Sequence, residues 1–151
     1  MTPSPIIQTA WRVLDLILQD ELPTDATLAQ ALDDLALAYH DTPEGTPAPD
    51  NQDPPARDQA ALRAIIGARF PDFGFYTVML DPLDMDMSAD KIGVGDAIDD
   101  LVDIAGDLAE AVWRFDHLGA GDAYWFLHLL HYHWGRHMRD LSLYLHARRF
   151  R

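Results

Sequence analysis

Residues 98–115, with the sequence IDDLVDIAGDLAEAVWRF, decide the fold of this chain. Apolar side chains recur there at intervals of three and four residues, at Ile98, Leu101, Ala105, Leu108, Val112 and Phe115. This spacing places one apolar seam along a helix, and such a seam packs against antiparallel neighbours. The stretch therefore predicts a long amphipathic helix inside a helical bundle.

Two further helices are predicted near the start of the chain. Ser4-Pro5 provides an N-cap followed by proline at the first helical position, and Pro23 ends this helix. Thr24 or Asp25 caps the second helix, whose apolar stripe consists of Leu28, Leu32, Leu35 and Tyr39.

The segments before residue 98 alternate between helix and loop. A third helix is predicted from near Asp58 to Phe70. Residues 73–80 are apolar and would also suit a strand, but we expect a short helix because no partner strand is evident nearby. Residues 41–56 hold five of the ten prolines and predict a mobile acidic loop, and residues 83–93 predict a second acidic loop.

The C-terminal part predicts a fifth helix. Gly119-Ala120-Gly121 breaks the chain, and Asp122 can cap a helix that reaches about Arg148. We therefore expect one all-α domain over residues 1–151. Its architecture is a bundle of four to five mostly antiparallel helices, with two long helices at the C-terminal end.

Composition limits the classes of function. The chain has 25 acidic residues, only three of them glutamate, against 11 basic ones, and it has no cysteine. A net charge of −14 disfavours nucleic acid as a partner, and the lack of cysteine excludes disulfides and thiolate chemistry. No signal-like or membrane-spanning stretch is evident, so we expect a cytoplasmic protein without membrane contact.

Charge is distributed unevenly along the chain. Residues 81–122 contain 12 acids and two bases, whereas residues 123–151 contain one acid and five arginines. We expect the basic C-terminal segment to pair with the acidic segment before it, in preference to DNA or RNA.

Four motifs resemble the bacterial domain-of-unknown-function family 5063. They are Asp81-Pro82, the run DDLVDI at residues 99–104, Trp125-Phe126, and the run HWGRH at residues 133–137. The resemblance covers roughly residues 10–146. It implies a helical, cytoplasmic, bacterial protein and implies no activity.

The histidines of the last helix offer the clearest candidate site. His133 and His137 are four residues apart and project from one face at the edge of the apolar stripe. They can pair with aspartates of a neighbouring helix, bind a divalent transition metal, or act in pH sensing or acid–base chemistry. Asp100 lies on the flank of the seam and is the carboxylate best placed to join them. Three further aspartates fall roughly opposite the seam, which weakens the metal interpretation: Asp99, Asp103 and Asp107.

Other candidate features are less informative. His128, His131 and His146 lie near the opposite arc and are expected to face solvent. Trp134 lies centrally on the stripe and is expected in the core, whereas Trp125 lies off it and could contact a partner.

Known site motifs are incomplete. Residues 84–95 begin like an EF-hand but lack its glycine and final glutamate, and no nucleotide loop or nucleophile elbow is present. No catalytic residue is therefore assigned.

The leading hypothesis is a non-enzymatic protein-interaction or regulatory module without a cofactor. Its candidate binding residues are His133, His137, Asp100, Trp125 and Arg136. The alternative is a metal-binding bundle, with hydrolytic chemistry left open, that uses His133, His137 and Asp100. Self-association through the seam of residues 98–115 is a third interpretation.

Overall fold

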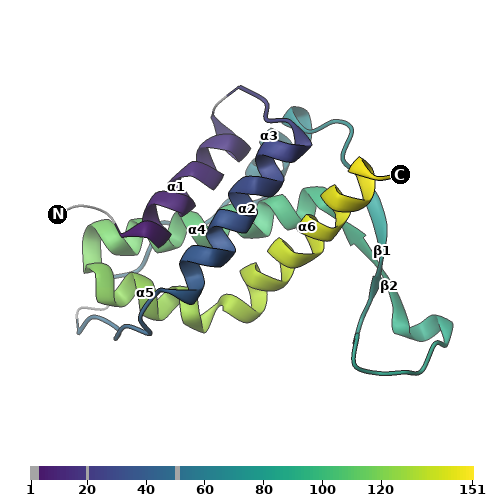
Figure 1. Ribbon diagram of the computed structural model, residues 1–151. Coiled ribbons are helices and arrows are strands. Elements are labelled where there is room, and N and C mark those ends of the chain that lie inside the picture. Colours follow the sequence, from purple (N-terminus) through teal and green to yellow (C-terminus); the bar gives the residue numbers. More distant parts are fainter. Residues whose placement is uncertain (1–3, 20, 50–51) are drawn as a thin grey trace.

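The computed structural model describes residues 4–19, 21–49 and 52–151 (Figure 1). Its first three helices are α1 (Pro5–Leu18), α2 (Asp25–His40) and α3 (Gln59–Arg69). All three lie where the sequence predicts them. Thr24 is the N-cap of α2, because its side chain accepts a hydrogen bond from the Thr27 amide at 3.1 Å. This bond satisfies one of the amides that a helix start leaves unpaired.

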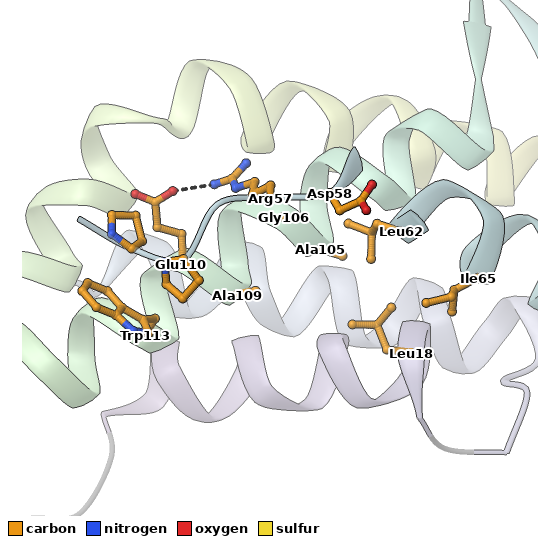
Figure 2. Close-up of a pocket in the computed structure, with 12 residues that line it drawn as sticks. Leu18, Arg57, Asp58, Leu62, Ile65, Ala105, Gly106, Ala109, Glu110 and Trp113 are labelled. Carbon is orange, nitrogen blue, oxygen red and sulfur yellow. Dashed lines mark hydrogen bonds and ion pairs between the residues drawn. The ribbon is translucent and has the colours of Figure 1, made fainter. Parts of the chain in front are cut away.

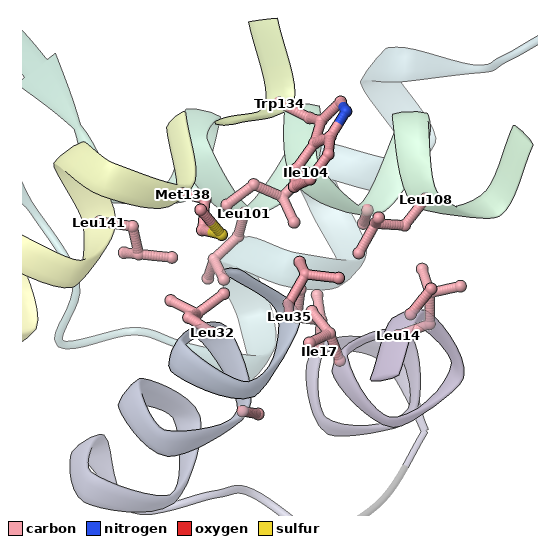
Figure 3. Packing of buried hydrophobic residues seen from close by; sticks show 14 of the residues in the cluster. Leu14, Ile17, Leu32, Leu35, Leu101, Ile104, Leu108, Trp134, Met138 and Leu141 are labelled. Carbon is pink, nitrogen blue, oxygen red and sulfur yellow. The ribbon is translucent and has the colours of Figure 1, made fainter. Parts of the chain in front are cut away.

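The fourth helix, α4 (Ala97–Leu118), is the centre of the bundle and contacts α1, α3, α5 and α6. Five of its six predicted seam residues are buried, and Phe115 is half-buried. Figure 3 shows Leu101, Ile104 and Leu108 facing the apolar residues of α1 and α2. The core of the single chain therefore buries the seam, which leaves it little exposed surface for the predicted self-association.

A β-hairpin replaces the helix predicted over residues 73–80. Strand β1 (Phe75–Met79) pairs antiparallel with β2 (Ile92–Asp96), in the register Phe75↔Asp96 to Met79↔Ile92. The chain is therefore mainly helical and not all-α. The partner strand and the short 3-10 turn η1 (Ala89–Lys91) overlap the end of the acidic loop predicted over 83–93.

Two glycines weaken the strand signal of β2. A β-carbon on Gly95 would lie 2.3 Å from the ring of Tyr76 across the hairpin, so a side chain there is excluded. The glycines that permit this packing also make β2 hard to recognise in the sequence, because glycine is uncommon in strands.

The predicted fifth helix is divided into three pieces. They are α5 (Ala120–Leu129), the π-helical turn η2 (His131–Gly135) and α6 (Arg136–Arg149). Asp122 is not a cap: it is buried within α5 and accepts hydrogen bonds from Arg114 and from the Ala48 amide, both at 2.8 Å. Of the two long C-terminal helices predicted, only α4 is continuous.

The proline-rich connection between α2 and α3 is anchored to the bundle. The amide of Thr46 donates to the carbonyl of Gly121 at 3.0 Å, and Arg57 forms salt bridges with two acids of α4. The contact of Thr46 lies within residues 41–56, the segment predicted as a mobile loop, and Arg57 follows directly after that segment. Within the described residues, no helix combines the length and apolarity needed to cross a bilayer.

Candidate metal centre

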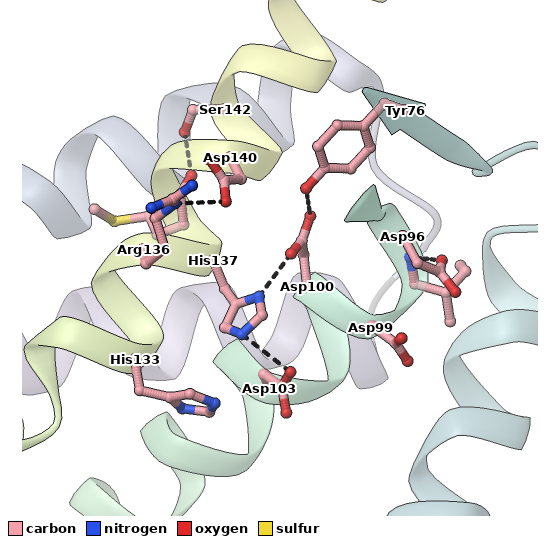
Figure 4. Close-up of polar contacts among 12 residues, drawn as sticks. Tyr76, Asp96, Asp99, Asp100, Asp103, His133, Arg136, His137, Asp140 and Ser142 are labelled. Atoms are coloured by element: carbon pink, nitrogen blue, oxygen red, sulfur yellow. Dashed lines mark hydrogen bonds and ion pairs between the residues drawn. The ribbon is translucent and has the colours of Figure 1, made fainter. Parts of the chain in front are cut away.

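The candidate site lies between the N-terminal half of α4 and the segment formed by η2 and the start of α6 (Figure 4). Asp100, Asp103 and Asp107 are spaced by three and four residues and therefore share one face of α4. Asp103 and Asp107 do point away from the seam, as predicted. That face, however, is covered by η2 and α6, which leaves Asp100 and Asp107 buried at 3% and 1% exposure.

His137 is held between two of these aspartates. Its Nδ1 donates to Oδ1 of Asp100 at 2.7 Å, and its Nε2 lies 3.2 Å from Oδ2 of Asp103. The hydrogen bond to Asp100 raises the pKa of His137, and Asp103 adds to this rise, whereas burial of the ring opposes it. The phenol of Tyr76 in β1 donates to the other oxygen of Asp100. Burial and this bond raise the pKa of Tyr76.

His133 is held in the same manner one turn earlier. Its Nδ1 lies 2.7 Å from Oδ2 of Asp107, whose Oδ1 accepts from Arg57 at 2.9 Å. Arg57 also donates to Glu110 at 2.8 Å. Asp107 is almost fully buried, and its two oxygens are engaged by Arg57 on one side and by the imidazole of His133 on the other. The predicted pairing of both histidines with aspartates of a neighbouring helix is therefore present.

Three residues of this cluster could hold one metal ion. Asp103, His133 and His137 each offer a ligand atom, and these atoms lie within 4.8 Å of one another. Because Nδ1 of each imidazole is engaged by a carboxylate, Nε2 is the nitrogen left for a metal. Asp100 was predicted as the third ligand, but both of its oxygens are occupied by His137 and Tyr76. Asp103 takes that place.

The π-helical turn η2 positions the histidines. Trp134 within it is fully buried, as predicted, and donates through Nε1 to the carbonyl of Leu127 at 2.9 Å. His131 stacks on Tyr39 of α2 with ring centroids 3.8 Å apart. Burial lowers the pKa of His131. π-helical turns occur often at functional sites, because they change the direction of side chains within a helix.

The prediction that His128 and His131 face solvent is wrong. His128 Nδ1 lies 3.0 Å from the hydroxyl of Tyr39, and its Nε2 lies 2.9 Å from the carbonyl of Thr42. Both rings contact Tyr39 and so lie between α2 and the C-terminal segment. His146 is exposed, as predicted.

Trp125 and Arg136, the other two candidate binding residues, do not join the cluster. Trp125 is half-buried and lies 5.9 Å from the guanidinium of Arg114. Arg136 is exposed, pairs with Asp140 at 2.8 Å and donates to the carbonyl of Met79 at 3.0 Å. Arg136 therefore connects α6 to strand β1 of the hairpin through its hydrogen bond to Met79.

Sequence reasoning missed Arg57 and Tyr76. Both are brought to α4 from distant segments, and neither has a local motif that would identify it. The spacing of Asp100, Asp103 and Asp107 was a usable signal, because aspartates three and four residues apart share a helix face.

An apolar pocket of about 410 Å³ lies on the other side of Arg57 (Figure 2). Residues of α1, α3 and α4 line it, among them Leu18, Leu62 and Trp113. Arg57 therefore borders both the pocket and the buried carboxylate that holds His133.

Comparison with known proteins addresses the fold only. No protein-family model matches the chain, and no curated protein matches it. Among solved structures, the chain is similar to protein BF1032 from Bacteroides fragilis, a structural-genomics target. The TM-score is 0.70 over 94% of this chain and 88% of that chain, at 14% sequence identity. The two proteins therefore share a fold, while the resemblance to family 5063 stays a prediction.

Proposed function

We propose that this protein binds one divalent transition metal ion through Asp103, His133 and His137. One observation carries the proposal: each imidazole is fixed through Nδ1 by a buried carboxylate of α4. Metal-binding histidines are commonly oriented in this way by an outer carboxylate, which fixes the tautomer and makes the other nitrogen a better ligand.

One of the ligand distances already suits this assignment, and all three ligand atoms lie within 4.8 Å of one another. Two ligand atoms bound to one ion at roughly 2.0–2.2 Å stand about 3 Å apart. His137 Nε2 and Asp103 Oδ2 are already separated by 3.2 Å. Two imidazoles and one carboxylate favour zinc, iron, nickel or manganese over calcium, which prefers an all-oxygen shell.

The position of the site favours an exchangeable ion. The side chains of Asp103, His137 and His133 are 24%, 27% and 35% exposed. Three protein ligands leave a coordination position for water or for a donor from another molecule. A water in that position is also what hydrolytic chemistry requires, so hydrolysis is the activity to assay once the metal is identified. The bound ion would link α4 to η2 and α6.

The test begins with elemental analysis of protein purified without a histidine tag. We expect close to one equivalent of zinc, iron, nickel or manganese, or the binding of one equivalent of Co²⁺ by chelator-treated protein. His133→Ala, His137→Ala and Asp103→Asn should each abolish stoichiometric binding. His146→Ala removes an exposed histidine of α6 and serves as the control. A wild-type protein that neither contains metal nor is stabilised by it would overturn the proposal.

A second variant tests the outer carboxylates. Asp107→Asn keeps the size of a side chain that touches His133 and Arg57, but removes its negative charge. We expect the affinity for Co²⁺ to fall by about 10–100-fold, the range typical of outer-shell substitutions, with one equivalent still bound. Unchanged affinity would argue that Asp107 has only a structural role.

The interaction module remains a second hypothesis, supported by the exposed apolar side chains of the hairpin. Cytoplasmic location and membership of family 5063 are predictions from the sequence.

A further inference from the structure

The hairpin carries the largest concentration of exposed apolar side chains. We call β1, the connecting segment 80–91 and β2 the arm, and Figure 1 shows it extending away from the helices. Of the 15 large apolar side chains that are exposed among the described residues, seven lie on the arm. Leu83 and Met85 at its tip are 90% and 84% exposed. Their own chain therefore does not cover them, and apolar patches of this kind commonly mark interaction sites.

The tip combines these apolar side chains with acids. Leu83, Met85 and Met87 alternate with Asp84 and Asp86. Each of these aspartates accepts a hydrogen bond from the amide two residues further on, at 2.9 and 3.0 Å. These local bonds shape the tip without contacts to the helices. Lys91 pairs with Asp84 at 3.3 Å, but residues 81–91 still hold four aspartates against this one lysine. Methionine-rich surfaces adapt readily to a partner, and the surplus of acids favours a basic one.

The complementary surface lies on α6 of the same chain. Arg139 and Leu143 are four residues apart and share an exposed face of α6, and the exposed Phe150 follows the last residue of the helix. We call these residues and Arg149 the outer face of α6. Arg149 lies beside Phe150. No salt bridge is found for Arg139, Arg149 or Arg151 in the part of the chain that the structure describes, whereas Arg136 and Arg148 pair with Asp140 and Asp25. The segment does pair with residues 81–122, as predicted, but the contacts are made by His133 and His137 and not by its arginines.

The C-terminal segment is the basic region of an acidic molecule. Residues 123–151 hold five arginines and one aspartate, whereas residues 1–122 hold 24 acids and six bases. An acidic tip is repelled by most of the surface of a second copy and is attracted to the outer face of α6.

We propose that the protein forms a homodimer in which the arm of each copy docks on the outer face of α6 of the other. The occupant of this surface is a second copy because the chain itself supplies both the acidic apolar tip and its basic apolar complement. Two identical contacts related by a two-fold axis close the assembly and cover both tips. The inference does not depend on metal binding, since the tip and the outer face of α6 contain none of the proposed ligands.

Sedimentation equilibrium tests the dimer. The wild-type protein should dimerise, and its dissociation constant should rise with salt, because the contact pairs opposite charges. Leu83→Ser, Met85→Ser and Met87→Ser combined should weaken the dimer by about 100-fold or more, the cost of removing several central apolar contacts. The control is the pair Leu22→Ser and Leu37→Ser, which removes apolar side chains exposed elsewhere. Far-UV circular dichroism verifies that each variant is folded.

A charge exchange identifies the two surfaces. Asp84→Arg with Asp86→Arg should abolish the dimer, and Arg139→Asp with Arg149→Asp should do the same. An equimolar mixture of these two double variants should form a heterodimer, because both of its contacts then pair opposite charges: one contact has the wild-type charges and the other has them exchanged. A monomeric wild-type protein at millimolar concentration would overturn the proposal, as would a mixture that stays monomeric. Binding of a foreign basic peptide by a monomeric wild-type protein would show that the arm serves another partner.

Discussion

Two neighbouring aspartates influence the pKa of His137 and therefore the charge of its ring. Asp100 and Asp103 contact it directly, Asp140 adds negative charge nearby, and these groups together raise its pKa against the effect of burial. The unfolded chain has a histidine pKa of about 6.5. Because the folded value is higher, the proton is bound more tightly in the native state and stabilises it.

This stabilisation depends on pH in a defined direction. It is fully present below the unfolded pKa and is lost as pH rises through the folded value. Urea unfolding with chelator present should therefore show that His137→Gln costs more stability at a pH of about 5.5 than at about 9. A cost that is constant, or larger at the higher pH, would contradict the assigned pairing.

Individual residues of the site differ in how far the sequence predicts them. The pairing of His133 and His137 follows from their spacing of four residues and the surplus of aspartates. Whether Asp100 or Asp103 serves as the third metal ligand depends on which carboxylate has an oxygen free. Tyr76 bonds to the second oxygen of Asp100, so Asp103 is the carboxylate left for the metal. Tyr76 comes from the hairpin, whose existence the sequence did not reveal.

Among the helical segments that the structure describes, η2 holds the glycine with the least room for a side chain. A β-carbon on Gly135 would lie 2.6 Å from Cδ2 and Nε2 of His131. That ring cannot retreat easily, because it is stacked on Tyr39 at 3.8 Å and lies edge-on to Trp134 at 4.8 Å. Gly135→Ala should therefore destabilise the protein by about 1–3 kcal/mol, the usual cost of overpacking.

A second glycine provides the control for this prediction. Gly67 in α3 has open space where a β-carbon would be. Gly67→Ala should be neutral or stabilise the protein by up to about 1 kcal/mol, because alanine favours helix. Thermal unfolding of both variants measures the difference, and equal effects would contradict the packing described for η2.

The elements with local signals were predictable, and those with distant partners were not. Caps and apolar periodicity at Thr24, Asp58 and along α4 identify helices without knowledge of the rest of the chain. The hairpin joins Phe75 to Asp96 across 20 residues, and its second strand contains two glycines. The break at η2 contains one glycine, Gly135, but a single glycine is tolerated within a helix, so a continuous helix was the expected result.

At the scale of the whole molecule, α4 serves two purposes on opposite faces. Its seam fills the hydrophobic core between α1, α2 and α6, and its aspartates hold the histidines of the candidate site. Since one rigid helix carries both, loss of core packing should also loosen the site.

Leu101→Ala tests this dependence. Leu101 is fully buried in the core cluster and directly follows Asp100. Its truncation should lower the free energy of unfolding by about 2–5 kcal/mol, as for other buried leucines. Because the described helices share one core, Trp fluorescence and far-UV circular dichroism should give the same urea midpoint in wild type and variant. Leu37→Ala removes an exposed leucine of α2 and should change stability by less than about 0.5 kcal/mol. Separate midpoints for the two probes would mean that the C-terminal segment unfolds independently of α4, and the site would then not depend on the core.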